Sequence, residues 1–207
     1  MIQNTLPDLI KQVRSLAQTG LHYQKDPYDQ ERYKELSDIS LQMLSLVMDQ
    51  PVANLESAFP ETDGYITPNV DVRAVVLNDK SELLMVKEAI DGKWSLPGGW
   101  ADIGYTPKEV AVKEVREEAG FTVKATRLLA LMDKKCHEHP VDVYYVYKIF
   151  ILCEESGPRL DSHHETTEVR FFPIGDLPEL SLPRNNQNQI RMVYDRAIDT
   201  GLAVYVD

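Results

Sequence analysis

The chain has 207 residues, of which 43% are hydrophobic and 27% charged, and its formal net charge is −11. This length and composition can form one good-sized domain, or a medium domain with a small addition. The acidic balance argues against broad electrostatic binding to nucleic acid or to anionic lipid, so neither is expected as a partner. The same balance suits a site in which carboxylates hold a metal ion.

Neither a disulfide framework nor a membrane segment is indicated. The only two cysteines, Cys136 and Cys153, are expected to be reduced thiols. The amphipathic N-terminus has no continuous apolar stretch and no small-residue cleavage site, and no run approaches the length of a membrane span. The expected location is the cytoplasm.

Two helices are predicted at the N-terminus. Thr5 can cap the first, in which apolar residues recur at helical spacing, and Gly20 is expected to end it. The second begins with Pro27 at its first position and stops before Pro51. Two such helices cannot bury their apolar faces alone, so they need the rest of the chain or another subunit to pack against. Residues 1–60 are expected to form a helical module that mediates a homodimer.

The pattern of the sequence changes after this module. Residues 51–69 contain three prolines and no clear periodicity, which is typical of a linker. Residues 71–78 and 82–88 are then predicted to form a hairpin of strands. A short strand at residues 94–96 leads into a glycine-rich turn.

The second half of the chain predicts more strands and two helices. One helix begins at Pro107, with Thr106 as its cap, and ends before Gly120. Three strands and a last helix are predicted at residues 121–133, 143–153, 166–173 and 186–200. The predicted fold is therefore a mixed sheet with two helices, of α+β or α/β/α sandwich type, preceded by the helical module.

Three acids gather on the predicted helix at residues 107–119. At roughly 100° per residue, Glu114, Glu117 and Glu118 share one sector. Like charges at this spacing destabilise a helix unless something neutralises them. The carboxylates, with the carbonyl of Gly98, are hard ligands suited to Mg²⁺ or Mn²⁺ that bridges substrate phosphates.

The alternative is a solvated helix face on which Lys113 and Arg116 balance the acids. The glycine-rich turn, the helix and the spacing of the three acids occur together, which argues against this alternative. The stretch resembles the Nudix box, Gly-x5-Glu-x7-Arg-Glu-U-x-Glu-Glu-x-Gly-U, in which U is bulky and apolar, and it matches in register from Gly99 to Phe121. Two positions depart from the pattern: Tyr105 replaces the first glutamate of the box, and Lys113 replaces its arginine.

The resemblance implies a Nudix α/β/α sandwich over residues 67–207 and metal-dependent hydrolysis of a nucleoside diphosphate linked to another group. It also implies that Glu114, Glu117 and Glu118 are the main ligands of Mg²⁺ or Mn²⁺. The missing first glutamate leaves the number of ions open, and Asp102 in the turn could compensate in part. Lysine in place of arginine keeps a cation but loses the fork that orients a carboxylate.

The helical module resembles the N-terminal extension of a Nudix branch from Gram-positive bacteria. Members of that branch are associated with ADP-ribose or CDP-choline pyrophosphatase activity. The resemblance therefore implies one of these two substrates. Two alternatives stay open: a house-cleaning enzyme for oxidised nucleotides, and a Nudix-like ligand sensor that uses the helices as a regulatory arm.

The general base is expected either in the loop after the box or within the box. Glu165 and Glu168 are the loop candidates, and a glutamate of the box, such as Glu117, is the other. The alternative for Glu168 is a purely structural role, as a polar residue at the beginning of a strand.

Substrate contacts are expected near the glycine turn, where Gly99 lets a phosphate approach the backbone. Trp100 could stack on a base, whereas Trp94 is as well explained by core packing. Arg73 could pair with a substrate phosphate or equally with a neighbouring carboxylate. The lysines and histidines of residues 134–142 could meet the distal group, although a solvated loop is the preferred interpretation.

Overall fold

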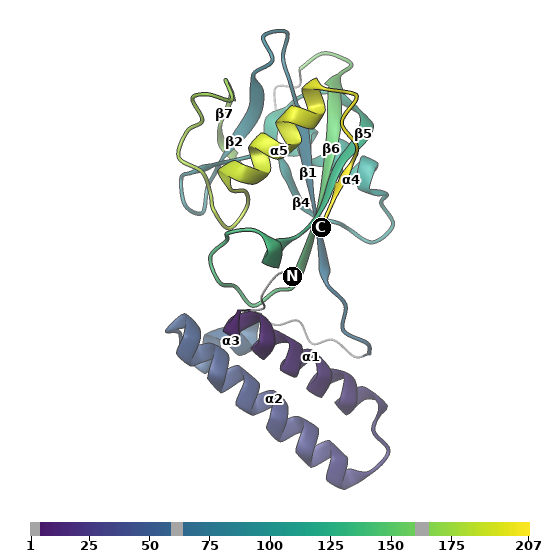
Figure 1. Cartoon of the computed structure of the whole chain (residues 1–207), viewed down its shortest axis with the longest axis vertical. Coiled ribbons are helices and arrows are strands. Elements are labelled where there is room, and N and C mark those ends of the chain that lie inside the picture. The colour runs from purple at the N-terminus through teal and green to yellow at the C-terminus, as the bar shows by residue number, and fades with distance from the viewer. Residues whose placement is uncertain (1–4, 59–63, 160–165) are drawn as a thin grey trace. The chain divides into compact units, whose positions relative to one another are not determined.

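The computed structural model describes residues 5–58, 64–159 and 166–207. The chain divides into two compact units (Figure 1). A helical unit comprises Met1–Pro68 together with Val141–Tyr145, and a sheet-containing unit comprises Asn69–Pro140 and Val146–Asp207. Among the described residues, no helix is long and apolar enough to cross a membrane.

The helical unit begins with two packed helices, α1 (Leu6–Tyr23) and α2 (Pro27–Met48). Each has the predicted start, since Thr5 caps α1 and the Asp26 side chain accepts a hydrogen bond from the second residue of α2. The predicted end of α1 at Gly20 is wrong. A Cβ at Gly20 would lie 2.5 Å from the Tyr33 ring of α2, so this glycine serves close helix packing instead.

A third helix, α3 (Val52–Ala58), lies where a linker was predicted. Its Leu55 is buried with Leu44 of α2 and Ile10 of α1, which gives this short helix a place in the core although its sequence shows no periodicity. Val143 is buried in the same core. The strand predicted at residues 143–153 therefore starts only at Val146, because the residues before it pack with the helices.

The other unit contains two sheets. The five-stranded sheet has the order β4-β1-β6-β5-β8, with β1 parallel to β6 and antiparallel to β4, which confirms the predicted mixed sheet. Its strands are β4 (Gly98–Trp100), β1 (Asn69–Val76), β6 (Val146–Glu155), β5 (Val123–Asp133) and β8 (Tyr205–Val206). The three-stranded sheet consists of β3 (Trp94–Ser95), β2 (Leu83–Glu88) and β7 (Thr166–Phe172), in that order.

Two local predictions in this unit need correction. β1 and β2 meet in a hairpin turn, where Leu77 bridges Leu83 and the Asn78 N–H donates to the Glu82 carbonyl, but beyond the turn they belong to different sheets. The glycine segment is not a turn but the edge strand β4, in which Gly99 pairs with Val72 of β1. Both errors arise because short strands carry little periodicity, whereas their pairing is decided by distant residues.

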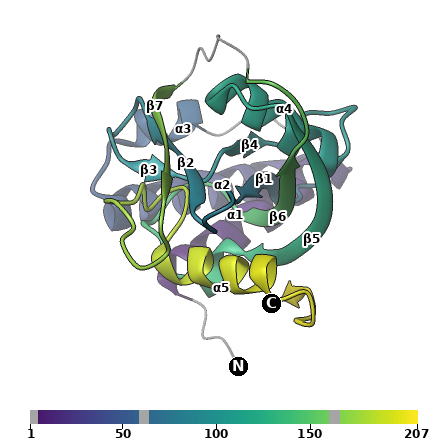
Figure 2. The same cartoon turned by 90° about the horizontal axis from the view of Figure 1, so that it is seen from above.

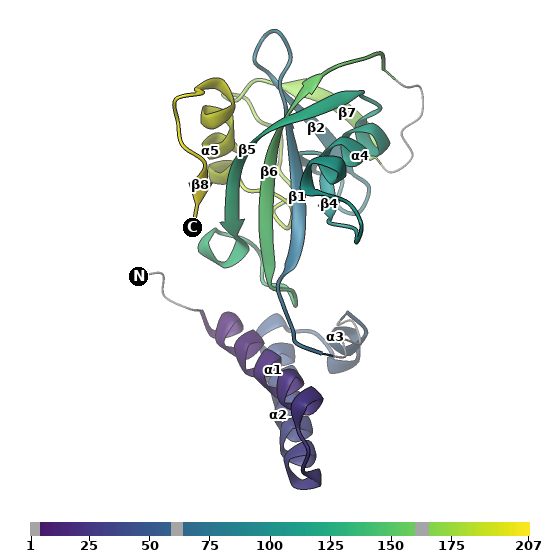
Figure 3. The same cartoon turned by 90° about the vertical axis from the view of Figure 1, so that its right-hand side faces the viewer.

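Helices cover both sides of the sheets, as the sandwich prediction required (Figures 2 and 3). On one side α4 (Pro107–Ala119) buries Val110, Ala111 and Val115 against β1 and β6. On the other, α5 (Gln187–Ile198) buries Ile190 and Val193. A single 3₁₀ turn, η1 (Lys134–Cys136), follows β5.

Candidate active site

The position of α4 is fixed at both ends by its own sequence. Thr106 and Glu109 form a capping box, in which the Glu109 carboxylate accepts from the Thr106 N–H at 2.8 Å. Gly120 ends the helix at φ 70°, a left-handed conformation that glycine adopts without strain. With the apolar side of α4 on the sheet, its carboxylates are left at the rim beside β4.

Glu118 reaches β4 from this rim. Its side chain is only 8% exposed, and its Oε2 accepts a hydrogen bond from the Gly98 N–H at 2.8 Å. Burial raises the pKa of Glu118 to about 8, and Glu114 and Glu88 add to the rise, whereas Arg73 and the bond from Gly98 oppose it. A buried carboxylate of this kind favours a proton or a metal cation as its counter-charge.

Gly98 is a position that only glycine can occupy. Its φ of +149° is rare for residues with a side chain, and a Cβ there would lie 2.1 Å from the Val72 carbonyl oxygen. Its N–H is the donor to Glu118. Metal binding by the Gly98 carbonyl stays a prediction.

Gly99 leaves room for a second carboxylate at the same strand. A Cβ on Gly99 would lie 3.1 Å from Oε1 of Glu114. Glu114 and Glu118 therefore approach β4 at two successive residues. Two of the three carboxylates predicted to bind metal are thus brought together.

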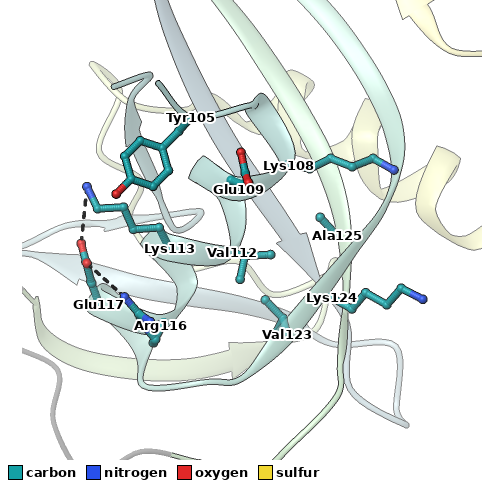
Figure 4. A pocket seen from close by; sticks show the side chains of 10 residues that line it. All are labelled: Tyr105, Lys108, Glu109, Val112, Lys113, Arg116, Glu117, Val123, Lys124 and Ala125. Carbon is teal, nitrogen blue, oxygen red and sulfur yellow. Dashed lines mark ion pairs between the residues drawn. The ribbon is translucent and has the colours of Figure 1, made fainter. Parts of the chain in front are cut away.

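Glu117, the third predicted ligand, is turned elsewhere. Its carboxylate pairs with Lys113 at 3.8 Å and with Arg116 at 3.6 Å (Figure 4). Lys113 also pairs with Asp102 at 2.7 Å. In the described part of the chain, no three His, Cys, Asp or Glu side chains converge as a metal site.

The donor chemistry nevertheless fits Mg²⁺ or Mn²⁺. Three carboxylates from successive turns of one helix, two of them at β4, provide the hard oxygen ligands that these ions prefer. The three carboxylates can bind one ion only if Glu117 leaves its ion pairs with Lys113 and Arg116. Both of these cations lie on the same helix and are partly exposed. Surface ion pairs of this kind contribute little stability, so a divalent cation could displace them.

Arg73 lies beneath this site in a buried ionic group. It is 1% exposed, pairs with Asp71 at 2.8 Å, and donates to the Leu96 carbonyl at 3.1 Å. Lys148 also bonds Asp71. Burial alone would raise the pKa of Asp71, but Arg73 and Lys148 hold it well below its usual range. Of the two roles expected for Arg73, the structure displays the bond to a neighbouring carboxylate.

Of the two loop candidates for the general base, the structure describes only Glu168. Glu168 lies in β7, where its carboxylate pairs with Arg170 and, at 3.7 Å, with Lys87. Glu165 lies outside the described residues. The role of either as base stays a prediction.

Trp100 and Trp94 have different environments. Trp100 is 45% exposed on β4 beside the two glycines, so its ring is accessible to a ligand. Trp94 is buried, with its ring edge against Phe172 at a centroid distance of 4.7 Å. Core packing is therefore the role of Trp94, whereas base stacking by Trp100 stays a prediction.

The histidines after β5 are held by partners within the protein, which corrects the expectation of a solvated loop. His137 Nε2 lies 3.0 Å from the Asp207 carboxylate, and His139 Nδ1 lies 2.6 Å from the Leu182 carbonyl oxygen. Burial lowers the pKa of His139 to about 4. These contacts join distant parts of the chain, which local sequence could not reveal.

Asp71 and Lys148 were missed as parts of the site region. Lys148 interrupts a run of apolar residues in one predicted strand, and Asp71 is the first residue of another. A charged residue in such a run is the available signal, because a buried charge needs a partner. Only the parallel pairing of β1 with β6, in which Asp71 is opposite Lys148, identifies that partner.

Comparisons with known proteins agree with this geometry. Residues 67–195 match the family model described as the NUDIX domain. Residues 4–59 match the model described as "UDP-X-like, N-terminal oligomerisation domain". Together the two matches span most of the chain.

Three similar proteins illustrate the relationship. The chain is 38% identical to "Putative ADP-ribose pyrophosphatase YjhB" of Bacillus subtilis strain 168, over 94% of this chain and 93% of that protein. A crystal structure of an ADP-ribose pyrophosphatase from Streptococcus suis is 34% identical, with a TM-score of 0.58 over 68% of this chain and 100% of that one. A crystal structure of UDP-X diphosphatase is 30% identical, with a TM-score of 0.63 over 96% of each chain. The chain thus belongs to the Nudix hydrolases, enzymes that act on pyrophosphate bonds.

Proposed function

We propose that this chain hydrolyses the pyrophosphate bond of ADP-ribose, giving AMP and ribose 5-phosphate. The observation that carries the proposal is the approach of Glu114 and Glu118 to the successive glycines of β4. The substrate is proposed from similarity, because two of the relatives above carry ADP-ribose pyrophosphatase in their names.

Glu114, Glu117 and Glu118 would hold Mg²⁺ or Mn²⁺, with the Gly98 carbonyl as a further ligand. Such an ion neutralises charge on the diphosphate and lowers the pKa of the attacking water. The chain's own contribution is positioning. Gly98 fixes Glu118 through its N–H, and Gly99 lets a phosphate come close to the backbone.

A proton acceptor for the water is still required. Glu165, Glu168 and Glu117 remain the candidates. Glu117 shares the helix of the other two metal-binding glutamates, so it would need no movement of another element to act. Trp100, half exposed on β4, is proposed to stack on the adenine.

A UDP-linked substrate is the second candidate. The similarity to UDP-X diphosphatase extends over 96% of the chain, and the model matched by the N-terminal residues carries the same substrate class in its description. CDP-choline is a third nucleoside diphosphate derivative, and it rests on the sequence resemblance alone.

The helical unit is proposed to form a homodimer. Several large apolar side chains of α1 and α2 are exposed at helical spacing, namely Leu6, Leu9, Leu16, Leu36, Ile39, Met43 and Leu46. Exposed apolar stripes of this kind are typical of interaction surfaces. The oligomerisation domain matched by residues 4–59 supports the same assignment.

The test is a substrate panel of ADP-ribose, UDP-glucose, CDP-choline and 8-oxo-dGTP, with Mg²⁺, Mn²⁺ or EDTA. We expect ADP-ribose to be cleaved fastest, with activity lost in EDTA and in the Glu118→Gln variant. Preference for UDP-glucose or CDP-choline would replace the proposed substrate. Binding of ADP-ribose without turnover of any substrate would instead indicate a ligand sensor.

A further inference from the structure

Arg184 is a partly exposed cation beside the end of β2. It lies just before α5, and its side chain is 37% exposed. Its Nε lies 3.6 Å from Oε2 of Glu88, the last residue of β2. This distance is longer than a charge-assisted hydrogen bond of about 2.7–2.9 Å, so the ion pair is loose. The two Nη groups make no hydrogen bond within the described part of the chain, so they are left for a ligand.

Glu88 is held in a fixed orientation by β3. Its Oε1 accepts a hydrogen bond at 2.6 Å from the hydroxyl of Ser95, which is fully buried. Its other oxygen is the one nearest Arg184, so Glu88 can direct the Arg184 side chain. Burial is the main cause of the raised pKa of Glu118, and the charge of Glu88 adds to it. Glu88 therefore lies within electrostatic reach of the proposed metal site.

Backbone hydrogen bonds give Arg184 the same placement. Its neighbour Asn185 is fully buried, and the Asn185 Oδ1 accepts a hydrogen bond at 3.0 Å from the Leu96 N–H. Gly98, which follows Leu96 by two residues, donates its N–H to Glu118. Because consecutive Cα atoms are about 3.8 Å apart, Arg184 and Gly98 both lie near the bond between Asn185 and Leu96. Arg184 is thereby anchored beside β4.

A cation at this position matches the charge of the proposed substrate. A diphosphate carries negative charge on both phosphates, and the glutamates of α4 repel it unless cations are present. Arg73, which was expected as a possible phosphate partner, is 1% exposed and bonded to Asp71 and to the Leu96 carbonyl. A guanidinium can donate two parallel hydrogen bonds to one phosphate, and the Nη groups of Arg184 provide such a pair.

We propose that Arg184 binds a phosphate of the substrate's diphosphate, and that Glu88 is the positioning residue that directs its guanidinium. The inference rests on the proposed function only in that the site takes a nucleoside diphosphate derivative, whichever group is linked to it. The diphosphate would then be neutralised from two elements, by the metal ion on α4 and by the segment before α5. A purely structural ion pair between Glu88 and Arg184 predicts instead that ligand binding does not depend on either residue.

The test is calorimetric titration of the full chain with methylenediphosphonate in the presence of Mg²⁺. This probe has the two phosphorus groups of a diphosphate but cannot be hydrolysed, and it lacks both base and sugar. Arg184→Met should weaken its binding by about 10-fold or more, because charge-assisted hydrogen bonds to a phosphate are lost. Arg184→Lys should weaken it less, since lysine keeps the cation but loses the fork. Arg191→Met, at an exposed position of α5, is the matched control and should bind like the wild type.

The role of Glu88 is tested by a double-mutant cycle. Glu88→Gln should weaken binding of the probe in the wild type but not in the Arg184→Met background, because Glu88 acts through Arg184. An equal effect in both backgrounds would overturn the positioning role.

Two results would overturn the role of Arg184: no saturable binding of the probe by the wild type, or equal affinity in Arg184→Met. If the urea midpoint shows that Arg184→Met is misfolded, the comparison of Arg184→Lys with the wild type decides instead. Cleavage of ADP-ribose by Arg184→Met with an unchanged KM would overturn this inference and leave the proposed function intact. Probe binding that depends on Arg184, without cleavage of ADP-ribose by the wild type, would support the inference and overturn only the proposed substrate.

Discussion

Replacing Arg73 by methionine should destabilise the Nudix unit more than replacing Lys148 by methionine, although both residues bond Asp71. Arg73 pairs with Asp71 at 2.8 Å and also donates to the Leu96 carbonyl at 3.1 Å. Methionine keeps an apolar stem but provides no donor. The variant therefore leaves a carbonyl without its bond, and it deprives Glu118 of a cation that favours its ionised form.

The magnitudes follow from what each substitution leaves behind. Removing one partner of a buried ion pair costs about 3–5 kcal/mol. The orphaned carbonyl of Leu96 adds about 1–3 kcal/mol for Arg73→Met. Asp71 keeps only its bond to Lys148 in Arg73→Met, whereas in Lys148→Met it keeps its several bonds to Arg73, so the loss there should stay below about 3 kcal/mol. Lys148 is also less favourable as a cation, since burial lowers its pKa to about 8.

Urea unfolding followed by tryptophan fluorescence measures the difference. The chain has two tryptophans, Trp94 in β3 and Trp100 in β4, so the signal reports on the Nudix unit rather than on the helices. Lys93→Met, which removes an exposed pair with Glu179, is the control and should leave the midpoint unchanged. A loss for Lys148→Met equal to or larger than that for Arg73→Met would refute the assigned geometry.

Three further variants test the site and the helical unit. Glu117→Gln should lower turnover of ADP-ribose by about 100-fold or more, because metal stabilisation contributes several kcal/mol, while the urea midpoint stays near wild type. Glu118→Gln should flatten the dependence of metal-free stability on pH. Burial raises the pKa of Glu118 from 4.5 to about 8, so the protonated side chain contributes fully to the free energy of unfolding below pH 4.5, and this contribution is lost as the pH rises through about 8. A free energy of unfolding that falls as steeply with pH in the variant as in the wild type would contradict the raised pKa. Leu46→Glu with Ile39→Glu, on the exposed stripe of α2, should convert a dimer to a monomer by light scattering, whereas Glu35→Gln should not.

The sequence was most informative where one element contains its own signals. The helix at α4 was predicted with the observed bounds, because Thr106, Pro107 and Gly120 mark its ends and its apolar residues recur on one side. The carboxylates at its rim follow from the same periodicity. With the apolar sector of the helix docked on the sheet, the carboxylates are expected beside Gly98 and Gly99, and Glu114 and Glu118 do approach these two residues.

The sequence was least informative where a residue's role depends on a distant partner. Gly20 looked like a helix end but accommodates the Tyr33 ring of another helix. Val143 looked like part of a strand, but it packs with helices from the other end of the chain. In both cases the conformation is decided by a tertiary contact, and the neighbouring residues in the sequence give no sign of that contact.

The two departures from the Nudix box are best understood together. Tyr105 and Lys113 are eight positions apart in the sequence, yet the Lys113 ammonium lies 5.6 Å from the centre of the Tyr105 ring. The same ammonium pairs with Asp102 at 2.7 Å and with Glu117 at 3.8 Å. Lysine cannot hold a carboxylate with the fork of an arginine, but here it lies among two carboxylates and an aromatic face that each stabilise a cation. Lys113, Asp102 and Tyr105 thus lie together in this chain, and compensation by Asp102 for the missing glutamate stays a prediction.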